Sequence, residues 1–501
     1  MQKPKGKRPR PPAPPTQVDD RGRHIRPSDS GALLRPADTD ALIEGACRLL
    51  RDTGCAFETG SEAMDLFDAA GCDVMAGGLV RFPTDLVHEA IATTAKSALL
   101  WDREGTSSIR IDTQHTWFIA GMTAIRVFDT HDGTTRSSSA ADLVMNTRIA
   151  DSLPNIDAVC ITCKDVDRPD SGGEVGEFAI LVRNTTKPLE FLCEDVTSLA
   201  AAIDIASRVR GSGTALREKP YFLHTITPLP LMYWHSHIDQ LILAARSGIP
   251  QSIGTLPIGG ASAPITMAGC MLNSLATDFA GMVLAQLAAP GSFAIGSSDV
   301  RFMEPATGSM GNTPQVWLTD IAIHEVRRKL GLPSFCGIAG RASARRFNQD
   351  AVWEISGSMA QAFFSRPATL DYLGLIDNGM AYSLHALCFC DELAGMLRTM
   401  WQGLHIDDDT MALDLAHEVG PRGNYLAQHH TARHCRDQLW PARYFGAHLP
   451  LSAGTLQDTD LVQRIDADLR HRLATHRPAP LRPDLDAWLS TREAAGSALA
   501  L

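Results

Sequence analysis

GIPQSIGTLPIGGASAP at residues 248–264 and GLPSFCGIAGRASA at residues 331–344 share one pattern, and that pattern decides the fold. Each begins with Gly and then Pro, which end a helix because Gly tolerates a left-handed backbone and Pro cannot continue the helix. An apolar run follows and ends in small or charged polar residues rather than in a hairpin turn. The repeat therefore predicts β-strand–α-helix units, and polar residues at the carboxyl ends of parallel strands are where α/β barrels place their chemistry.

Seven apolar runs separated by segments of helical length are predicted strands. They are residues 156–163, 189–194, 220–228, 251–257, 292–299, 334–340 and 370–374. With an eighth strand that the pattern does not locate, they predict an α/β protein with a TIM (β/α)₈ barrel. A doubly wound open sheet is the alternative, although no G-x-G-x-x-G follows any of these runs.

The barrel is expected to occupy residues 116–450, with three other regions around it. Residues 1–35 are basic and rich in Pro, which predicts a disordered tail because little apolar surface can be buried. Residues 36–115 predict an N-terminal helical layer, and residues 451–501 predict a C-terminal helical extension.

Charge and composition narrow the possible functions. The chain of 501 residues carries a net charge of −11, which argues against nucleic-acid binding because that needs a basic face. Apolar stretches such as residues 279–290 are too short to cross a membrane, and no secretory signal is visible. The eleven cysteines follow no disulfide framework, which favours reduced thiols in a cytoplasmic protein.

Polar and aromatic side chains that follow the predicted strands should converge at one mouth of the barrel. The candidates are Asp299 and His224 for orienting a substrate, and Glu194, Thr227, Thr255, Ser297, Phe302, Arg341, Arg345 and Tyr382 for binding it. Aromatic faces can hold a quaternary ammonium group by cation–π attraction. We expect His224, Thr255, Asp299 and Arg341 to lie at the same end, although Ser, Thr and Asp also cap helices.

The motif HHTARHC near residue 430 is the one candidate for a metal site on a helix. His430 and His434 are four residues apart, a spacing that can hold zinc. There is no H-E-x-x-H motif and no acidic third ligand at that spacing. The sequence therefore predicts no metal bound by this chain.

Three stretches resemble the trimethylamine methyltransferase family. They are residues 255–315, which begin TLPIGGASAP and end GNTPQ, then GMTAIRVFDTHDGTTR at residues 121–136, and GPRGNYLAQHHTARHCR at residues 420–436. The resemblance spans roughly residues 40 to 450. It implies a TIM barrel that passes a methyl group from a methylamine to a cobalt corrinoid on a partner protein.

The resemblance also implies a branch of that family. The classical trimethylamine enzymes carry pyrrolysine, encoded by an in-frame stop codon, and this sequence has none. It is similar to the non-pyrrolysine branch, some of whose members demethylate quaternary amines such as glycine betaine. The family commonly shows an S-D-x-K-like segment after the sixth strand, whereas this chain reads RASAR at residues 341–345.

The resemblance predicts a small methylated amine as substrate and a corrinoid-binding protein as partner. No cofactor is expected to be bound tightly by this chain, because the partner supplies the corrinoid. A quaternary amine leaves as a neutral amine, so the protein needs only to position and desolvate the cation. Two alternatives stay open: a metal-dependent lyase or hydrolase that uses Asp299, His224 and Glu194, and a non-catalytic barrel that binds a small molecule. A homo-oligomer is compatible with each of them.

Deleting residues 1–30 should leave the melting temperature nearly unchanged, because this segment has little apolar surface to bury. Differential scanning calorimetry of the full and shortened chains tests this. A drop of more than a few degrees would show that the segment packs on the folded protein.

Overall fold

Eight parallel strands close a barrel in the computed structural model, which describes residues 32–129, 133–166, 171–436, 438–444 and 461–494. The strands are β6 (Trp117–Ala120), β9 (Ala158–Val159), β10 (Leu189–Phe191), β11 (Phe222–Ile226), β13 (Gln251–Ile253), β15 (Ala294–Ser298), β17 (Phe335–Cys336) and β18 (Thr369–Leu373). Each pairs with the next along the chain, and β18 pairs with β6. The predicted TIM barrel is confirmed, and β6 is the strand that the sequence pattern did not locate.

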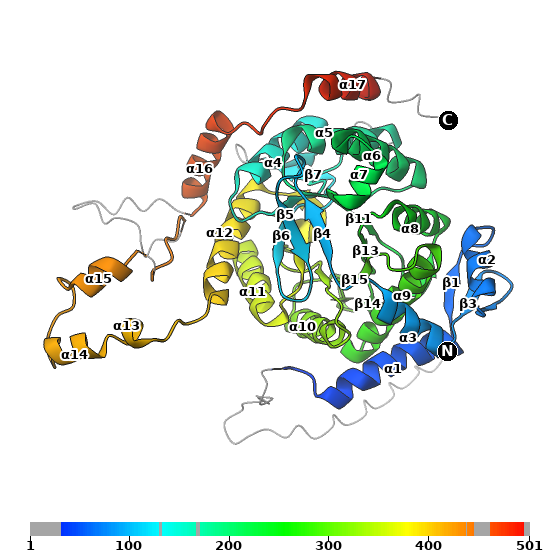
Figure 1. Cartoon of the computed structure of the whole chain (residues 1–501), viewed down its shortest axis with the longest axis horizontal. Coiled ribbons are helices and arrows are strands. Elements are labelled where there is room, and N and C mark those ends of the chain that lie inside the picture. The colour runs from blue at the N-terminus through cyan, green and yellow to red at the C-terminus, as the bar shows by residue number, and fades with distance from the viewer. Residues whose placement is uncertain (1–31, 130–132, 167–170, 437, 445–460, 495–501) are drawn as a thin grey trace, which may run out of the picture.

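A ring of helices surrounds the barrel (Figure 1). They are α4 (Ala140–Ser152), α5 (Ser171–Asn184), α6 (Val196–Arg210), α7 (Gly213–Glu218), α8 (His235–Ser247), α9 (Met267–Ala288), α10 (Pro314–Lys329), α11 (Gln349–Ser365) and α12 (Leu384–Trp401). Phe178 of α5 packs edge-on against Phe191 and Phe222, which shows that these two strand residues face the helices. Because side chains alternate along a strand, Glu190 and Leu223 face the barrel interior.

Helix α9 is longer than the apolar run at residues 279–290 suggested. It has 22 residues and, among the described helices, is the one long and apolar enough to cross a membrane. However, 72% of its most apolar window is buried within the fold. It packs against β15, α8 and the N-terminal helices, so its apolar character is accounted for by protein contacts.

The N-terminal layer holds the predicted helices together with strands that were not predicted. The helices are α1 (Pro36–Asp52), α2 (Glu62–Ala69) and α3 (Thr84–Thr93). The strands β1 (Cys55–Phe57), β2 (Asp73–Val74) and β3 (Leu79–Arg81) join β12 (Met232–Tyr233) in one sheet, and β4 (Ala98–Trp101) pairs with β5 (Ser108–Ile111). Most of the predicted tail, residues 1–31, lies outside the described residues.

Two small sheets sit beside the barrel strands. The strands β14 (Ile258–Gly259) and β16 (Arg301–Phe302) pair with each other, each shortly after a barrel strand. A four-stranded sheet contains β7 (Arg126–Phe128), β8 (Thr135–Ser137), β19 (Leu375–Ile376) and β20 (Ala381–Tyr382), with the short 3₁₀ helix η1 (Asp377–Gly379) between the last two. These additions thicken the wall at the carboxyl ends of the strands.

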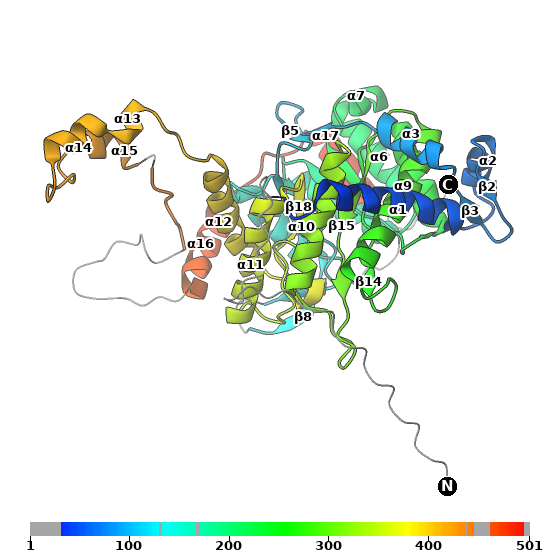
Figure 2. The same cartoon turned by 90° about the horizontal axis from the view of Figure 1, so that it is seen from below.

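The chain leaves the barrel after α12, well before the predicted boundary at residue 450. The helices α13 (Asp408–Met411), α14 (Leu413–Val419) and α15 (His429–His434) project away from it (Figure 2). Within the predicted C-terminal extension, α16 (Leu461–Thr475) packs on α4 and α12, and α17 (Pro483–Ala494) packs on α5.

A buried ion pair fastens α9 and α10 to the outside of β15. The Arg327 guanidinium donates to the Asp278 carboxylate and to the Ser297 carbonyl, the latter at 2.7 Å. Gly296 is required here, because a Cβ at this position would overlap the Asp278 carboxylate. Burial raises the pKa of Asp278 to about 7 although the Arg327 charge opposes the shift. Removing either side chain would therefore leave an uncompensated buried charge and destabilise the fold.

Replacing Asp278 with Ala should lower the free energy of unfolding by about 3–5 kcal/mol, because it leaves a buried guanidinium uncompensated. Glu62→Ala is the matched control, since Glu62 pairs with Arg246 on the exposed surface, and it should change stability little. Urea unfolding followed by circular dichroism measures both. Equal losses of unfolding free energy in the two variants would contradict a special role for the buried Asp278–Arg327 pair.

Candidate active site

Two carboxyl groups lie inside the barrel wall. Glu190 of β10 and Asp371 of β18 are almost fully buried, and Glu190 accepts a hydrogen bond from the Thr225 hydroxyl at 2.7 Å. One oxygen of each carboxyl, Oε2 of Glu190 and Oδ1 of Asp371, has no hydrogen-bond partner among the described residues. Buried polar atoms are nearly always paired, so these two oxygens make the interior of the barrel a candidate binding place, although other buried polar atoms of the described chain also lack a partner.

Both carboxyl groups hold their protons more tightly than usual. Burial raises the pKa of Glu190 to about 7, against the opposing effect of the Thr225 hydrogen bond. Burial and then the neighbouring Glu190 carboxyl raise the pKa of Asp371 well above its ordinary value. Two such groups cannot both ionise easily in a shared site. At neutral pH the pair therefore carries a partial negative charge that a bound cation would strengthen.

An arginine–aspartate cluster follows strands β15 and β17. The Asp299 carboxylate lies 2.7 Å from the Arg301 guanidinium and 3.4 Å from that of Arg341. Arg301 also donates to the Gly337 carbonyl at 3.2 Å and to Asn312 at 3.1 Å. Burial, followed by the like charge of Arg341, lowers the pKa of Arg301 to about 10. Arg301 is thus held through both terminal nitrogens of its guanidinium, whereas the contact of Arg341 with Asp299 is longer.

An aromatic ring completes this cluster. The Arg341 guanidinium carbon lies 5.1 Å from the centre of the Tyr372 ring. A Cβ at Gly337 would lie 2.9 Å from that ring, so only glycine leaves the space. The pairing register of β18 shifts between Leu370 and Leu373, which interrupts the alternation of side chains. The sequence analysis missed Tyr372, and the run LDYLG, an acid next to an aromatic in a predicted strand, was the signal for it.

Several predicted residues do lie at this end of the barrel. Asp299 and Arg341 contact each other, as described above, and Thr255 follows β13 at the same end, where its buried hydroxyl donates to the Pro228 carbonyl at 2.8 Å. Thr227 is exposed just after β11, and Phe302 is half-buried in β16. Ser297 is buried within β15.

The prediction for His224 is wrong. Its neighbour Thr225 bonds to Glu190 inside the barrel, so alternation turns the His224 ring outward to the helices. There its Nδ1 lies 3.1 Å from the Phe191 carbonyl. Burial lowers the pKa of His224 to about 4, and Gln240 and His237 of α8 are the nearby side chains that act on it. His224 is a neutral residue of the outer core, not a group at the barrel mouth.

Three further candidates do not join the cluster. Glu194 is exposed, and its backbone N–H donates to the Glu174 carboxylate at 3.0 Å. The Arg345 side chain is 89% exposed and lies 3.6 Å from Asp377. Tyr382 is buried in β20, where burial raises the pKa of its hydroxyl well above the ordinary value. Each was placed correctly near a strand end, but the side chain points elsewhere.

The metal-centre alternative required Asp299, His224 and Glu194 to meet, and they do not form a ligand group in the described part of the chain. Two other groups of three have ligand atoms within 4.8 Å of one another: Asp320, His324 and Cys336, and Asp409, His430 and His434. The second group contains an acidic residue that the sequence spacing around His430 did not reveal.

The first of these groups is a hydrogen-bonded network of the core. His324 bonds to Asp320 through one ring nitrogen, at 3.1 Å, and to Ser334 through the other. Gln361 donates to the second Asp320 oxygen at 2.8 Å. The Cys336 thiol also faces Asp320, and burial raises its pKa well above the ordinary value. These hydrogen bonds join α10, α11 and β17.

A lysine with two acids lies beyond β9 and was also missed. Lys164 donates to Glu174 at 2.7 Å and lies 3.5 Å from Glu177. Burial raises the pKa of Glu177 to about 7, although Lys164 opposes the shift. Lys164 follows a strand, and Glu174 lies on the next helix ten positions later. Their contact therefore depends on the turn between the strand and the helix.

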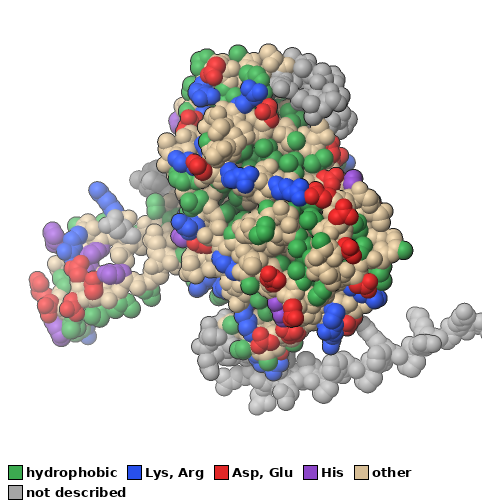
Figure 3. Space-filling view, turned by 45° about the vertical axis from the view of Figure 1, so that its right-hand side comes forward, with side chains coloured by type: hydrophobic (Ala, Val, Ile, Leu, Met, Phe, Trp, Pro, Cys, Tyr) green, Lys and Arg blue, Asp and Glu red, His purple; other side chains and the backbone are tan. Residues whose placement is uncertain are grey.

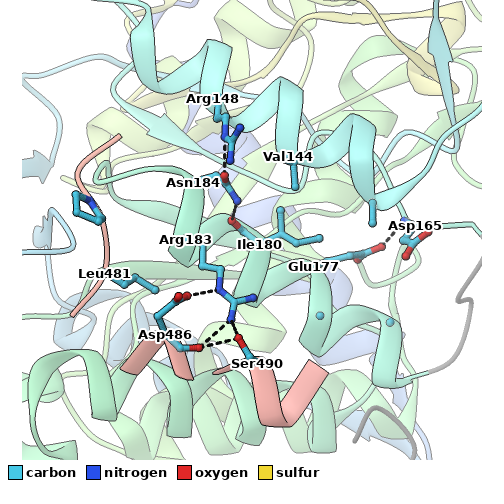
Figure 4. A pocket seen from close by; sticks show the side chains of 14 residues that line it. Val144, Arg148, Asp165, Glu177, Ile180, Arg183, Asn184, Leu481, Asp486 and Ser490 are labelled. Carbon is cyan, nitrogen blue, oxygen red and sulfur yellow. Dashed lines mark hydrogen bonds and ion pairs between the residues drawn. The ribbon is translucent and has the colours of Figure 1, made fainter. Parts of the chain in front are cut away.

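A hollow of about 760 Å³ lies between α4, α5 and α17, outside the barrel (Figure 4). Its charged side chains are already engaged: Arg183 pairs with Asp486 at 2.7 Å, and Arg148 donates to Asn184 at 2.8 Å. Because it is lined by the outer helices, it does not open on the carboxyl pair. The candidate active site is therefore the barrel mouth.

Comparison with known proteins identifies the family of this chain. The family model described as trimethylamine methyltransferase (MTTB) matches residues 5–494. The chain belongs to the trimethylamine methyltransferase family. That family and its named relatives indicate a methyltransferase.

Two relatives illustrate the range of the family. The chain is 24% identical to the trimethylamine methyltransferase of Desulfitobacterium hafniense strain DSM 10664 / DCB-2, over 78% of this chain and 79% of the relative. It is 26% identical to the glycine betaine methyltransferase of Desulfitobacterium hafniense strain Y51, over 89% and 93%. The solved monomethylamine methyltransferase of Methanosarcina barkeri aligns over 94% of both chains, at 12% identity and a TM-score of 0.47. This similarity is too low to support an argument, and the barrel is observed directly in the present structure.

Glu190→Gln should stabilise this methyltransferase more at pH 8 than at pH 5. The folded-state pKa of about 7 lies above the unfolded value of roughly 4.3. The folded state therefore holds the proton more tightly, and its stability is greatest at low pH and falls as the pH rises through 7. A neutral amide avoids that loss, on the order of 2 kcal/mol.

Thermal melts of both forms across pH 5 to 8 measure this difference. Glu194→Gln is the control, because Glu194 is exposed and should show the same pH dependence as the native chain. A constant offset between native and Glu190→Gln proteins at every pH would contradict a buried, protonated Glu190.

Proposed function

We propose that this chain transfers a methyl group from a quaternary amine to Co(I) of a corrinoid carried by a partner protein. The observation that carries the proposal is the pair of buried carboxyls, Glu190 and Asp371, beside Tyr372 at the barrel mouth. Membership of the family supports a methylated amine as substrate, and the relative named glycine betaine methyltransferase supports a quaternary one. The corrinoid supplies the nucleophile, and this chain is expected to hold no cofactor of its own.

The residues at the mouth suit a permanent cation. A quaternary ammonium cannot donate hydrogen bonds, so it is held by charge and by aromatic faces. The Glu190–Asp371 pair supplies negative charge in a region shielded from water, where electrostatic attraction is stronger than in solvent. The Tyr372 ring lies nearby, with the Arg341 guanidinium over it. As the cation enters, it favours ionisation of the carboxyl pair, whose pKa values are raised in the free protein.

The reaction needs no proton transfer from the protein. The methyl carbon accepts the electron pair of Co(I), the carbon–nitrogen bond breaks, and its electron pair leaves on nitrogen. A quaternary amine thus releases a neutral tertiary amine, whereas trimethylamine would release an amide anion unless it is first made cationic. The residues at the mouth therefore position and desolvate the substrate. The absence of pyrrolysine from the sequence supports the same branch of the family.

Arg341 is the residue that would recognise a carboxylate on the substrate. Its contact with Asp299 is long, at 3.4 Å, while Arg301 holds the same oxygen at 2.7 Å. Arg341 can therefore turn part of its guanidinium to a second carboxylate without leaving Asp299 unpaired. Guanidinium binds carboxylate through two parallel hydrogen bonds. The sequence offered Arg341 and Arg345 equally, and burial of Arg341 favours it over the exposed Arg345.

Arg341→Ala should raise KM for a carboxylate-bearing quaternary amine by roughly 30-fold, which corresponds to about 2 kcal/mol for a lost charged hydrogen bond. KM for tetramethylammonium, which has no carboxylate, should change little. Arg345→Ala is the matched control and should leave both values unchanged. The absorbance change on methylation of Co(I) in a reduced corrinoid protein reports the rate.

The same assay tests the proposal as a whole over quaternary and tertiary amines. Turnover of quaternary amines without turnover of trimethylamine is the expected result. Turnover of trimethylamine alone would overturn the branch assignment. No turnover of any amine by a competent corrinoid protein would favour the non-catalytic binding barrel.

A further inference from the structure

The loop at residues 341–345, which reads RASAR, follows β17 and begins with Arg341. Two polar side chains hold its backbone. The Arg341 carbonyl accepts a hydrogen bond from the Asn312 amide at 2.8 Å. The Ser343 N–H and hydroxyl both donate to the Glu354 carboxylate of α11, at 2.5 Å and 2.7 Å. Asn312 also donates to Glu354 at 3.2 Å, so these two side chains act on the loop as one connected group.

The turn between β19 and β20 holds further backbone groups of the same loop. The Ala342 N–H donates to the Leu375 carbonyl at 3.0 Å, and the Asn378 N–H donates to the Ala342 carbonyl at 3.1 Å. The Asp377 N–H donates to the Ala344 carbonyl at 2.8 Å. Asp377 and Asn378 have φ values of 52° and 56°, a left-handed conformation that costs free energy in residues other than Gly. Such a turn persists where its surroundings hold it, and the hydrogen bonds to the loop do so here.

The Arg341 side chain extends from this fixed backbone into the mouth of the barrel. Its guanidinium lies 3.4 Å from the Asp299 carboxylate and over the Tyr372 ring, and 12% of the side chain is exposed. The long contact lets the guanidinium turn, while the hydrogen-bonded backbone keeps its starting point in place. The position of the guanidinium is therefore set from behind, by Asn312 and Glu354.

The charge of the whole protein gives a carboxylate no general attraction. The net charge of the chain is −11, and Figure 3 shows acidic and basic side chains mixed over one outer face of the molecule. Long-range attraction of an anion needs an extended field of positive charge. Recognition of a carboxylate therefore depends on local geometry, because the paired hydrogen bonds of a guanidinium need correct distance and direction.

We propose that Glu354 and Asn312 are positioning residues that hold Arg341 for a substrate carboxylate, and so set the preference of the site for carboxylate-bearing quaternary amines. This role rests on the proposed function, because it requires Arg341 to meet the substrate. Without Glu354, both hydrogen-bonding groups of Ser343 lose their acceptor, and the loop is free to carry Arg341 away. A displacement of about 1 Å is enough to weaken a directed contact strongly.

The charge of Glu354 has an effect of the opposite sign. Removing a carboxylate close to Arg341 leaves the mouth more positive, which by itself strengthens the binding of an anionic group. Loss of position therefore weakens the binding of a carboxylate, whereas loss of charge strengthens it. The direction of the change in KM separates the two effects.

Glu354→Ala should raise KM for glycine betaine about tenfold and leave kcat, and KM for tetramethylammonium, within about twofold of native. Glu354→Gln should keep KM for glycine betaine near the native value, because its amide oxygen can still accept from the Ser343 N–H. It also keeps the test decisive if the Ala variant does not fold. Asp350→Ala is the matched control, since Asp350 lies on the same helix with an exposed side chain, and it should behave like the native chain.

A double-mutant cycle shows whether Glu354 acts through Arg341. In the Arg341→Ala background, Glu354→Ala should raise KM for glycine betaine no further, because the group that it positions is gone. Additive effects, or equal rises in KM for glycine betaine and tetramethylammonium, would overturn the positioning role. A lower KM for glycine betaine in both Glu354 variants would overturn it too, because charge alone would then explain the change.

Calorimetric dissociation constants for glycine betaine, which need no corrinoid, separate this role from the proposed function. They should follow the same order as the KM values. If glycine betaine binds with the expected differences among the variants but no methyl group is transferred, the proposed function fails and the positioning role stands. If methyl transfer occurs and Glu354→Ala matches the native chain in KM and in dissociation constant, the positioning role fails and the proposed function stands.

Discussion

The pairing of β18 with β6 is the contact on which the rest of the structure depends. It joins segments about 250 residues apart, with Leu370 opposite Phe118 and Thr369 opposite Trp117. The Thr116 hydroxyl adds a hydrogen bond to the Pro367 carbonyl at 2.6 Å. Closing so long a loop costs chain entropy that only the completed barrel can offset. Once it closes, every strand ends on the same side, and the side chains that follow the strands are gathered at one mouth.

The closed barrel also separates two kinds of buried charge. Outside the strands, Arg327 pairs with Asp278, an opposite charge, and fastens two helices. Inside, Glu190 and Asp371 lie near each other with unpaired oxygens and raised pKa values. The first arrangement stabilises the fold, whereas the second is costly to the free protein. Costly polar groups of this kind persist where a ligand satisfies them. The like-charged pair inside the barrel, in contrast to the oppositely charged pair outside it, is therefore the basis of the substrate site proposed above.

The segment after α12 holds the histidine motif that was the candidate for a metal site. There Asp409 accepts hydrogen bonds from Arg433 and His434, while the side chains of Leu404, Ile406 and Leu426 face solvent. A feature that looks like a metal motif in sequence therefore belongs, in the fold, to an exposed hydrogen-bonded group.

The sequence by itself indicated a barrel and located seven of its eight strands. Gly248 and Gly331 end helices at matching points, and the apolar runs between them have strand length, so local backbone preferences repeat in register with the fold. It also placed Asp299 and Arg341 correctly after their strands. Only the tertiary structure decided which side chains face inward. His224 and Thr225 are adjacent and equally polar, yet one faces α8 and the other faces Glu190. Which side chains of a short, fully buried strand point into the barrel depends on how the strand pairs with its neighbours, because both faces of such a strand are buried and the sequence pattern does not distinguish them. For the same reason, the meeting of Glu190 with Asp371, and of Asp409 with His434, could not be predicted: each joins residues whose proximity is set by closure of the chain and not by local spacing.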